Sequence, residues 1–198
     1  MEKFSRVEKT SLLAPKPTDK QVYDGKYLKV IDNGSGKEWV KSHDKIFVLP
    51  YLMYEASVIM NHEQIPSFSH RYNGSSVAVD SYYLTAVGGS IDGDENPISA
   101  MKRELAEEAG LILSDMKDFD VEGPYFPCKE SGDRYYLCVM KLNPGEYKFV
   151  STHKDGSGAD GNASKPVKVS IGDLNDIIVH DMITKQLIDL LKKECNMK

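Results

Sequence analysis

Cysteine is scarce in this chain and is not arranged for metal or disulfide chemistry. The 198 residues include three cysteines, at Cys128, Cys138 and Cys195, with no CxxC pair. An odd, sparse set of cysteines is typical of a reducing compartment, not of a disulfide-stapled secreted domain. The N-terminal residues also lack the charged and then apolar pattern of a signal peptide. We therefore expect a cytoplasmic protein.

Long apolar runs and an excess of positive charge are also absent. No apolar stretch approaches the ~18 residues that a membrane-spanning helix needs, and the formal net charge is −5. General binding to nucleic acid or to an anionic membrane surface requires basic patches, so the composition argues against both classes. A chain of this length with 40% hydrophobic and 28% charged residues fits one globular domain with a small appended unit.

The start of the chain indicates that small unit. Residues 26–32 alternate like a strand, the sequence NGSG at 33–36 predicts a turn, and residues 38–42 are expected to form the returning strand. A lone hairpin buries too little surface to be stable, so we expect it to pack on the main domain or on a second subunit. We place this β subdomain at residues 1–48 and the main domain at residues 49–198.

The remaining pattern alternates strands with a central and a terminal helix. Expected strands lie at 46–49, 56–61, 67–72, 81–87, 120–126, 135–142 and 167–169. A short capped helix is expected after Ser170, and an amphipathic helix over 181–194. This order favours an α/β class fold, an α/β/α sandwich around a mixed sheet.

The stretch from Gly88 to Leu111 (GGSIDGDENPISAMKRELAEEAGL) is expected to form a tight glycine turn and then a helix. Asn96 can cap the helix, Pro97 suits its first turn, and Gly110 suits a left-handed stop. Three apolar residues at helical spacing predict a buried stripe: Ile98, Met101 and Leu105.

Three carboxylates on this helix need an explanation. Glu104 and Glu108 lie one turn apart and repel each other by a few tenths of a kcal/mol, whereas Glu107 can pair with Arg103. Two interpretations stay open. The acids are either a solvated helix face or an oxygen-only site for Mg²⁺ or Mn²⁺.

The full spacing resembles the Nudix box. The defined residues run Gly89, five residues, Glu95, seven residues, Arg103-Glu104-Leu105, one residue, Glu107-Glu108, one residue, Gly110-Leu111. Every defined position is filled, over about an eighth of the chain. The resemblance implies a hydrolase of nucleoside diphosphates linked to another group.

The resemblance also implies roles for individual residues. Mg²⁺ or Mn²⁺ would be bound by Glu104, Glu107 and Glu108, with the backbone carbonyl of Gly88. Arg103 would orient the glutamates, with Glu95 as its partner. The general base stays open among Asp160, Asp155, Glu130, Asp133 and Glu107.

Outside the box, the chain is similar to the ADP-ribose pyrophosphatase branch. In that branch a β subdomain precedes the main domain and is commonly exchanged or packed across a homodimer. Pro127 matches a proline marker, and Trp39 matches a hairpin tryptophan that stacks on adenine; the alternatives are a simple turn and a packed aromatic. Arg71 stands where the family has an arginine facing the phosphates, and Asp133 is a further substrate-binding candidate.

Two departures from that branch bear on the substrate. The stretch TAVGG at 85–89 lacks the glutamate and proline of the usual Glu-Leu-Pro-Ala-Gly, and residues 159–165 lack glutamates. The leading expectation is cleavage of ADP-ribose to AMP and ribose 5-phosphate. The alternatives are another nucleoside diphosphate sugar, a dinucleotide such as NADH or a diadenosine polyphosphate, and a Nudix-fold nucleotide sensor without turnover.

Overall fold

The chain forms two compact units. The structure is a computed structural model that describes residues 20–25, 28–34, 37–64, 82–114, 119–150 and 165–196. One unit comprises Met1–Asp44 and Pro124–Tyr135, and the other comprises Lys45–Gly123 and Tyr136–Lys198. The first unit thus includes a segment from the middle of the chain besides its N-terminal part. The expected strand at 67–72 lies outside the described residues.

The first unit contains a three-stranded antiparallel sheet, which confirms the predicted N-terminal β unit. Its strands are β1 (Lys20–Asp24), β2 (Lys29–Asp32) and β3 (Glu38–Lys41), in that order. The turn after β2 places Gly34 at φ 73°, with its N–H donating to Asp32 Oδ1 at 2.8 Å. Strand β1 was not predicted, because all five of its residues are exposed and no apolar alternation marks it. The homodimer that the resemblance implies stays a prediction.

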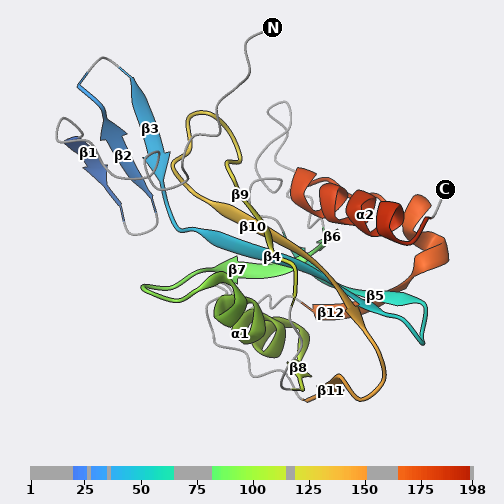
Figure 1. The fold of residues 1–198 in the computed structure, drawn as a ribbon. Coiled ribbons are helices and arrows are strands. Elements are labelled where there is room, and N and C mark those ends of the chain that lie inside the picture. The colour runs from blue at the N-terminus through green and yellow to red at the C-terminus, as the bar shows by residue number, and fades with distance from the viewer. Residues whose placement is uncertain are drawn as a thin grey trace, which may run out of the picture. The chain divides into compact units, whose positions relative to one another are not determined.

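The second unit is built on a seven-stranded mixed sheet with a helix on each face, as expected (Figure 1). The sheet order is β12–β5–β4–β10–β9, with β6 paired to β5 and β7 paired to β4. These strands are β4 (Lys45–Leu52), β5 (Ser57–Gln64), β6 (Tyr82–Thr85), β7 (Val87–Ser90), β9 (Glu122–Tyr125), β10 (Tyr135–Leu142) and β12 (Lys165–Ser170). The helices are α1 (Pro97–Ala109) and α2 (Met182–Glu194).

Smaller elements complete the second unit. A two-stranded antiparallel sheet joins β8 (Leu111–Leu113) to β11 (Tyr147–Phe149). The predicted short helix is the 3₁₀ turn η2 (Ile171–Asn175), in which Ser170 Oγ accepts from the N–H of Gly172. Within the part of the chain that the structure describes, no helix has the length and apolarity to cross a membrane.

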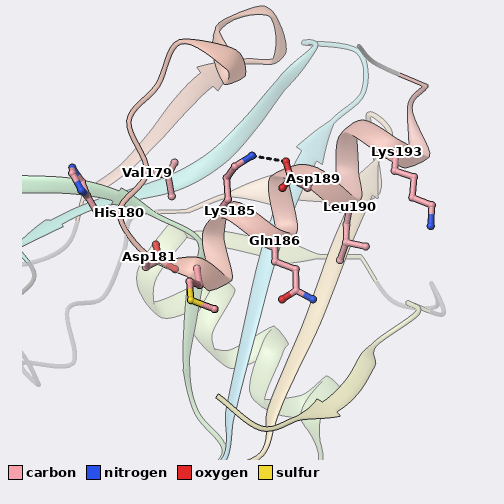
Figure 2. Close-up of a pocket in the computed structure, with 9 residues that line it drawn as sticks. Val179, His180, Asp181, Lys185, Gln186, Asp189, Leu190 and Lys193 are labelled. Atoms are coloured by element: carbon pink, nitrogen blue, oxygen red, sulfur yellow. Dashed lines mark hydrogen bonds and ion pairs between the residues drawn. The ribbon is translucent and has the colours of Figure 1, made fainter. Parts of the chain in front are cut away.

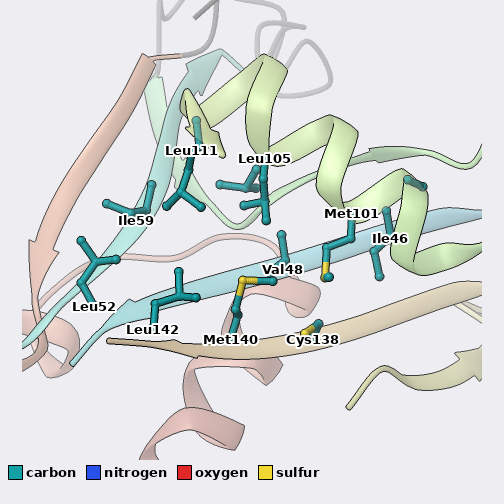
Figure 3. Packing of buried hydrophobic residues seen from close by; sticks show 13 residues of the cluster. Ile46, Val48, Leu52, Ile59, Met101, Leu105, Leu111, Cys138, Met140 and Leu142 are labelled. Atoms are coloured by element: carbon teal, nitrogen blue, oxygen red, sulfur yellow. The ribbon is translucent and has the colours of Figure 1, made fainter. Parts of the chain in front are cut away.

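Two hydrophobic cores lie on opposite faces of the sheet because successive strand residues point to opposite sides. The core under α1 takes alternate residues of β4 and β10 together with helix side chains (Figure 3): Ile46, Val48, Leu52, Cys138, Met140, Leu142, Met101 and Leu105. The core under α2 takes the intervening residues of the same two strands together with side chains of α2: Phe47, Leu49, Leu137, Val139, Leu187, Ile188 and Leu191. Strands buried on both faces lack a polar side, which explains the nearly continuous apolar sequence of β4 and β10.

Helix α1 is capped as predicted, but its buried stripe lies differently. Asn96 Oδ1 accepts from the N–H of Ser99 at 2.9 Å, and Gly110 ends the helix at φ 60°. The prediction that Ile98 is buried is wrong, since this side chain is 42% exposed. The face of α1 that packs on the sheet includes Glu104, and Ile98 lies at the edge of this face in the first turn. The buried residues of α1 are Ala100, Met101, Glu104, Leu105 and Ala109.

The predicted glycine turn is also wrong, because Gly88 and Gly89 lie inside strand β7. Strands β4 and β5 pair directly at only two positions, and beyond them the β6–β7 segment pairs with both: β6 with β5 and β7 with β4. A Cβ on Gly88 would overlap the carbonyl oxygen of Ile46, and a Cβ on Gly89 would overlap the Glu104 carboxylate. These glycines therefore permit close approach of neighbouring atoms and do not reverse the chain.

The junction between β6 and β7 is held by helix α2. The N–H of Ala86 donates to Thr184 Oγ1 at 2.7 Å, and both residues are buried. We expect Thr184→Val to lower the free energy of unfolding by about 1–3 kcal/mol, because it keeps the side-chain volume but leaves a buried N–H without an acceptor. Denaturant titration measures this change. Thr184→Ser keeps the hydroxyl and should be the milder substitution; a valine variant as stable as the parent would contradict the expectation.

Candidate functional site

Two glutamates of α1 point inward onto the β6–β7 segment. Glu104 is 7% exposed and its carboxylate lies against Gly89. One turn on, Glu108 Oε2 accepts from Asn61 Nδ2 of β5 at 2.6 Å, and Glu108 also has a backbone hydrogen bond from Gly88. The helical spacing of four residues brings both acids to one face, as the sequence indicates. A solvated helix face does not describe Glu104.

The two inward acids, buried Glu104 and half-buried Glu108, carry an electrostatic cost. Burial, followed by repulsion from Glu104 and Glu63, raises the pKa of Glu108 to about 8, although the bonds from Gly88 and Asn61 oppose that rise. Burial also raises the pKa of Glu104, against the effect of Arg103. Each carboxylate therefore favours neutralisation, by a proton or by a bound cation.

Arg103 joins the helix to the segment that precedes it. Its guanidinium donates to Glu95 Oε2 at 3.0 Å, Glu104 Oε1 at 2.8 Å, Glu107 Oε2 at 3.3 Å and the carbonyl of Ser90 at 2.7 Å. The bond from Arg103 holds the pKa of Glu95 below its usual value. The predicted partnership of Arg103 with Glu95 is thus present, and the same guanidinium restrains Glu104.

We expect Arg103→Ala to lower the free energy of unfolding by about 1–3 kcal/mol, because it leaves the partly buried carboxylates of Glu95 and Glu104 without their donor. Arg103→Lys should recover only part of this loss, since one ammonium cannot reproduce the planar fork that reaches four groups. Thermal and denaturant unfolding measure both. The matched control is Lys102→Ala, an exposed neighbour that should change stability by less than about 0.5 kcal/mol. Equal effects at both positions would contradict this account.

The part of the site that lies on β5 was not predicted from the sequence. Asn61 and Glu63 continue the α1-facing side of β5 after Ile59. Asn61 is 1% exposed, and Glu63 Oε1 accepts from Thr85 Oγ1 of β6 at 2.7 Å. The two-residue period of a strand could have revealed these residues. Polar residues that continue the inward-facing side of an apolar strand mark a buried polar site.

The oxygens gathered here suit a hard divalent cation. Among the described residues no three His, Cys, Asp or Glu side chains converge as a metal site. Glu107 is paired with Arg103 at 3.3 Å. The donor set is nevertheless all oxygen: buried Glu104, half-buried Glu108 and Asn61 Oδ1, which accepts no hydrogen bond from any described residue. Mg²⁺ is commonly held by one or two carboxylates plus substrate phosphates. The residues present therefore fit the predicted cofactor, and the role of the Gly88 carbonyl stays a prediction.

Two predicted substrate residues lie in the first unit, within its own packing. A Cβ on Gly132 would overlap the Trp39 ring, so the indole lies directly against this glycine. Asp133 is 5% exposed and accepts from both the N–H and the hydroxyl of Ser42, each at 2.7 Å. The packed-aromatic interpretation of Trp39 gains support, and adenine stacking stays a prediction. The part of Asp133 in substrate binding or as the base is likewise a prediction.

The other predicted residues divide between exposed and undescribed positions. Pro127 lies in an exposed bend after β9. Glu130 is also exposed, and its carboxylate lies 3.5 Å from Lys129 Nζ. Arg71, Asp155 and Asp160 fall outside the described residues.

A separate hollow of about 550 Å³ runs along α2 (Figure 2). Lys185 and Asp189, which line it, form a 2.6 Å ion pair that cancels their charges. None of its lining residues belongs to the Glu104 and Glu108 cluster. The hollow therefore contains none of the predicted site residues.

Comparison with known proteins gives a structural likeness only. No protein-family model matches the chain, and no curated protein matches its sequence. A solved structure described as "Crystal structure of ADP compounds hydrolase" is similar, with a TM-score of 0.61 and 15% sequence identity over 90% of this chain and 91% of that chain. At this identity the likeness shows a shared fold across nearly the full length of both chains.

Proposed function

We propose that this chain is a divalent-cation-dependent Nudix pyrophosphatase that hydrolyses the diphosphate linkage of a nucleoside diphosphate derivative. One observation carries the proposal: Glu104 and Glu108 are turned inward against the β6–β7 segment and restrained by Arg103 and Asn61. Inward acids with raised pKa values are unfavourable for the fold alone and are typical of functional sites. The fold shared with an ADP compounds hydrolase supports the same reaction class.

In the proposed mechanism Glu104 and Glu108 hold Mg²⁺ or Mn²⁺, with Glu107 and the Gly88 carbonyl as further candidate ligands. When bound, the cation neutralises the diphosphate and lowers the pKa of water. Arg103 keeps the Glu104 carboxylate oriented through its 2.8 Å bond, and Asn61 does the same for Glu108 at 2.6 Å. The bonds from Arg103 to the Ser90 carbonyl and from Gly88 to Glu108 join α1 to β7. Acids held in place before substrate arrives need less reorganisation during reaction.

ADP-ribose is the leading substrate in this proposal, with AMP and ribose 5-phosphate as products. The test incubates the purified full chain with Mg²⁺ or Mn²⁺ and a panel of ADP-ribose, other nucleoside diphosphate sugars, NADH and diadenosine polyphosphates. Mass spectrometry identifies the products. We expect cation-dependent cleavage of the diphosphate, and complete inertness toward the whole panel at micromolar enzyme would contradict the proposal.

A nucleotide sensor without turnover is the second candidate. It is favoured by the lack of glutamates at 159–165 and by the engagement of Glu107 with Arg103. Both features leave the general base unidentified. Calorimetric titration with ADP-ribose alongside the product assay separates the two: tight binding without AMP release indicates a sensor, and AMP release indicates an enzyme.

A further inference from the structure

Asn61 on β5 has an unusual hydrogen-bonding state for a buried amide. The residue is 1% exposed, and its Nδ2 donates to Glu108 Oε2 at 2.6 Å. Its Oδ1 is buried and accepts no hydrogen bond within the described residues. A buried acceptor without a donor is costly, so this oxygen calls for a partner outside the described residues, such as a water or a cation.

The surroundings of this oxygen are rich in acceptors. Oδ1 is two bonds from Nδ2, so it lies beside the Glu108 carboxylate that the nitrogen contacts. The hydroxyl of Thr85, the residue opposite Asn61 on β6, is already donated to Glu63 Oε1 at 2.7 Å. No basic side chain among the described residues forms an ion pair with Glu63 or Glu108. The donors at Asn61, Gly88 and Thr85 are already used by Glu108 and Glu63. Such a surplus of acceptor oxygens is complementary to a hard divalent cation.

We propose that Asn61 is a ligand of that cation through Oδ1, so that the metal site extends from α1 onto β5. The inference rests on the cation dependence of the proposed function and adds a ligand outside the Nudix box. In this arrangement one amide acts twice, because its nitrogen restrains Glu108 and its oxygen binds the ion. A shift of β5 would then move a ligand of the ion and change the affinity of the protein for the cation.

The solution test is calorimetric titration of the full chain with Mn²⁺ alone, without substrate. Asn61→Ala and Asn61→Leu should each weaken Mn²⁺ binding by about 10- to 100-fold, the range seen when a supporting residue of a metal site is lost. The matched control is Ser57→Ala, because the hydroxyl of Ser57 is another buried β5 group with no hydrogen-bond partner among the described residues. This control should leave Mn²⁺ affinity unchanged. Unaltered affinity in both folded Asn61 variants would overturn the inference, and thermal unfolding verifies that they are folded.

Diffraction at the manganese absorption edge, from crystals grown with Mn²⁺, tests the same inference directly. An anomalous peak within about 2.0–2.4 Å of Asn61 Oδ1 supports it. A peak held by Glu104 or Glu108 with Asn61 Oδ1 outside the ligand set, or with only a water on that oxygen, overturns the inference and leaves the proposed function intact. No manganese at α1, together with no Mn²⁺ binding in solution, overturns both.

Discussion

Replacing Glu108 by glutamine is expected to lower cation-dependent turnover by about 10²–10³-fold, because the variant loses the negative charge that would hold the ion while keeping nearly the same shape. The amide can still pair with Asn61, which donates at 2.6 Å in the parent protein, so the fold should survive. Steady-state assays on the best substrate of the panel, with Mn²⁺ affinity from calorimetry, measure the change.

The same substitution should increase stability in metal-free buffer. The folded pKa of Glu108 is raised to about 8, above the ordinary glutamate value of 4.5. The stabilisation that comes from its bound proton is therefore complete below pH 4.5. That stability is lost as the pH rises through 8. At pH 8 to 9 the parent protein therefore carries a cost, of the order of a few kcal/mol, that glutamine does not have. Unfolding curves in chelator at pH 5 and pH 9 should diverge more for the parent than for the variant, which keeps the raised pKa of Glu104.

Two further measurements check this interpretation. Asp189→Asn removes an exposed helix carboxylate of α2, paired with Lys185, and should leave turnover and the pH dependence of stability unchanged. Adding Mn²⁺ should reduce the loss of parental stability at high pH, since the ion favours the ionised carboxylate. Parental turnover in Glu108→Gln would contradict the proposed role of the residue.

Local signals in the sequence predicted the helix well. The cap at Asn96 and the stop at Gly110 depend on neighbours within one turn, and both are confirmed. Strand β10 was predicted with its observed bounds, Tyr135–Leu142, because an apolar run limited by polar residues marks a strand buried on both faces. The four-residue spacing of Glu104 and Glu108 places them on one face of α1. Both therefore point inward once that face is known to be the inward one.

Features that depend on contacts between distant residues were not predicted. The direct contact of Asn61 with Glu108 joins residues 47 positions apart, and no short pattern encodes it. The position of β7 between β4 and α1 likewise assigns the two glycines to close packing, whereas the same dipeptide in isolation favours a turn. The segment Pro124–Tyr135 belongs to the N-terminal unit through hydrogen-bonded pairs such as Ser42 with Asp133. Only the folded chain brings such residues together.

Replacing the two glycines of β7 by alanine should impair different properties, turnover at Gly89 and stability at Gly88. This contrast is the second large effect that we expect. At Gly89 the added Cβ would meet the end of a flexible side chain, the Glu104 carboxylate, which can rotate away. Gly89→Ala should therefore fold with a stability within about 1 kcal/mol of the parent. Turnover should fall by about 10²-fold, since a displacement of about 1 Å at a catalytic group has that effect.

At Gly88 the added Cβ would instead meet the backbone carbonyl oxygen of Ile46, which is held in the pairing of β4 with β7. Gly88→Ala should therefore lower the free energy of unfolding by about 1–3 kcal/mol through overpacking. Denaturant titration and Mn²⁺ calorimetry on both variants test the contrast. If Gly89→Ala keeps parental Mn²⁺ affinity and turnover, the Glu104 carboxylate does not need its position over β7, and the site must be built from other groups.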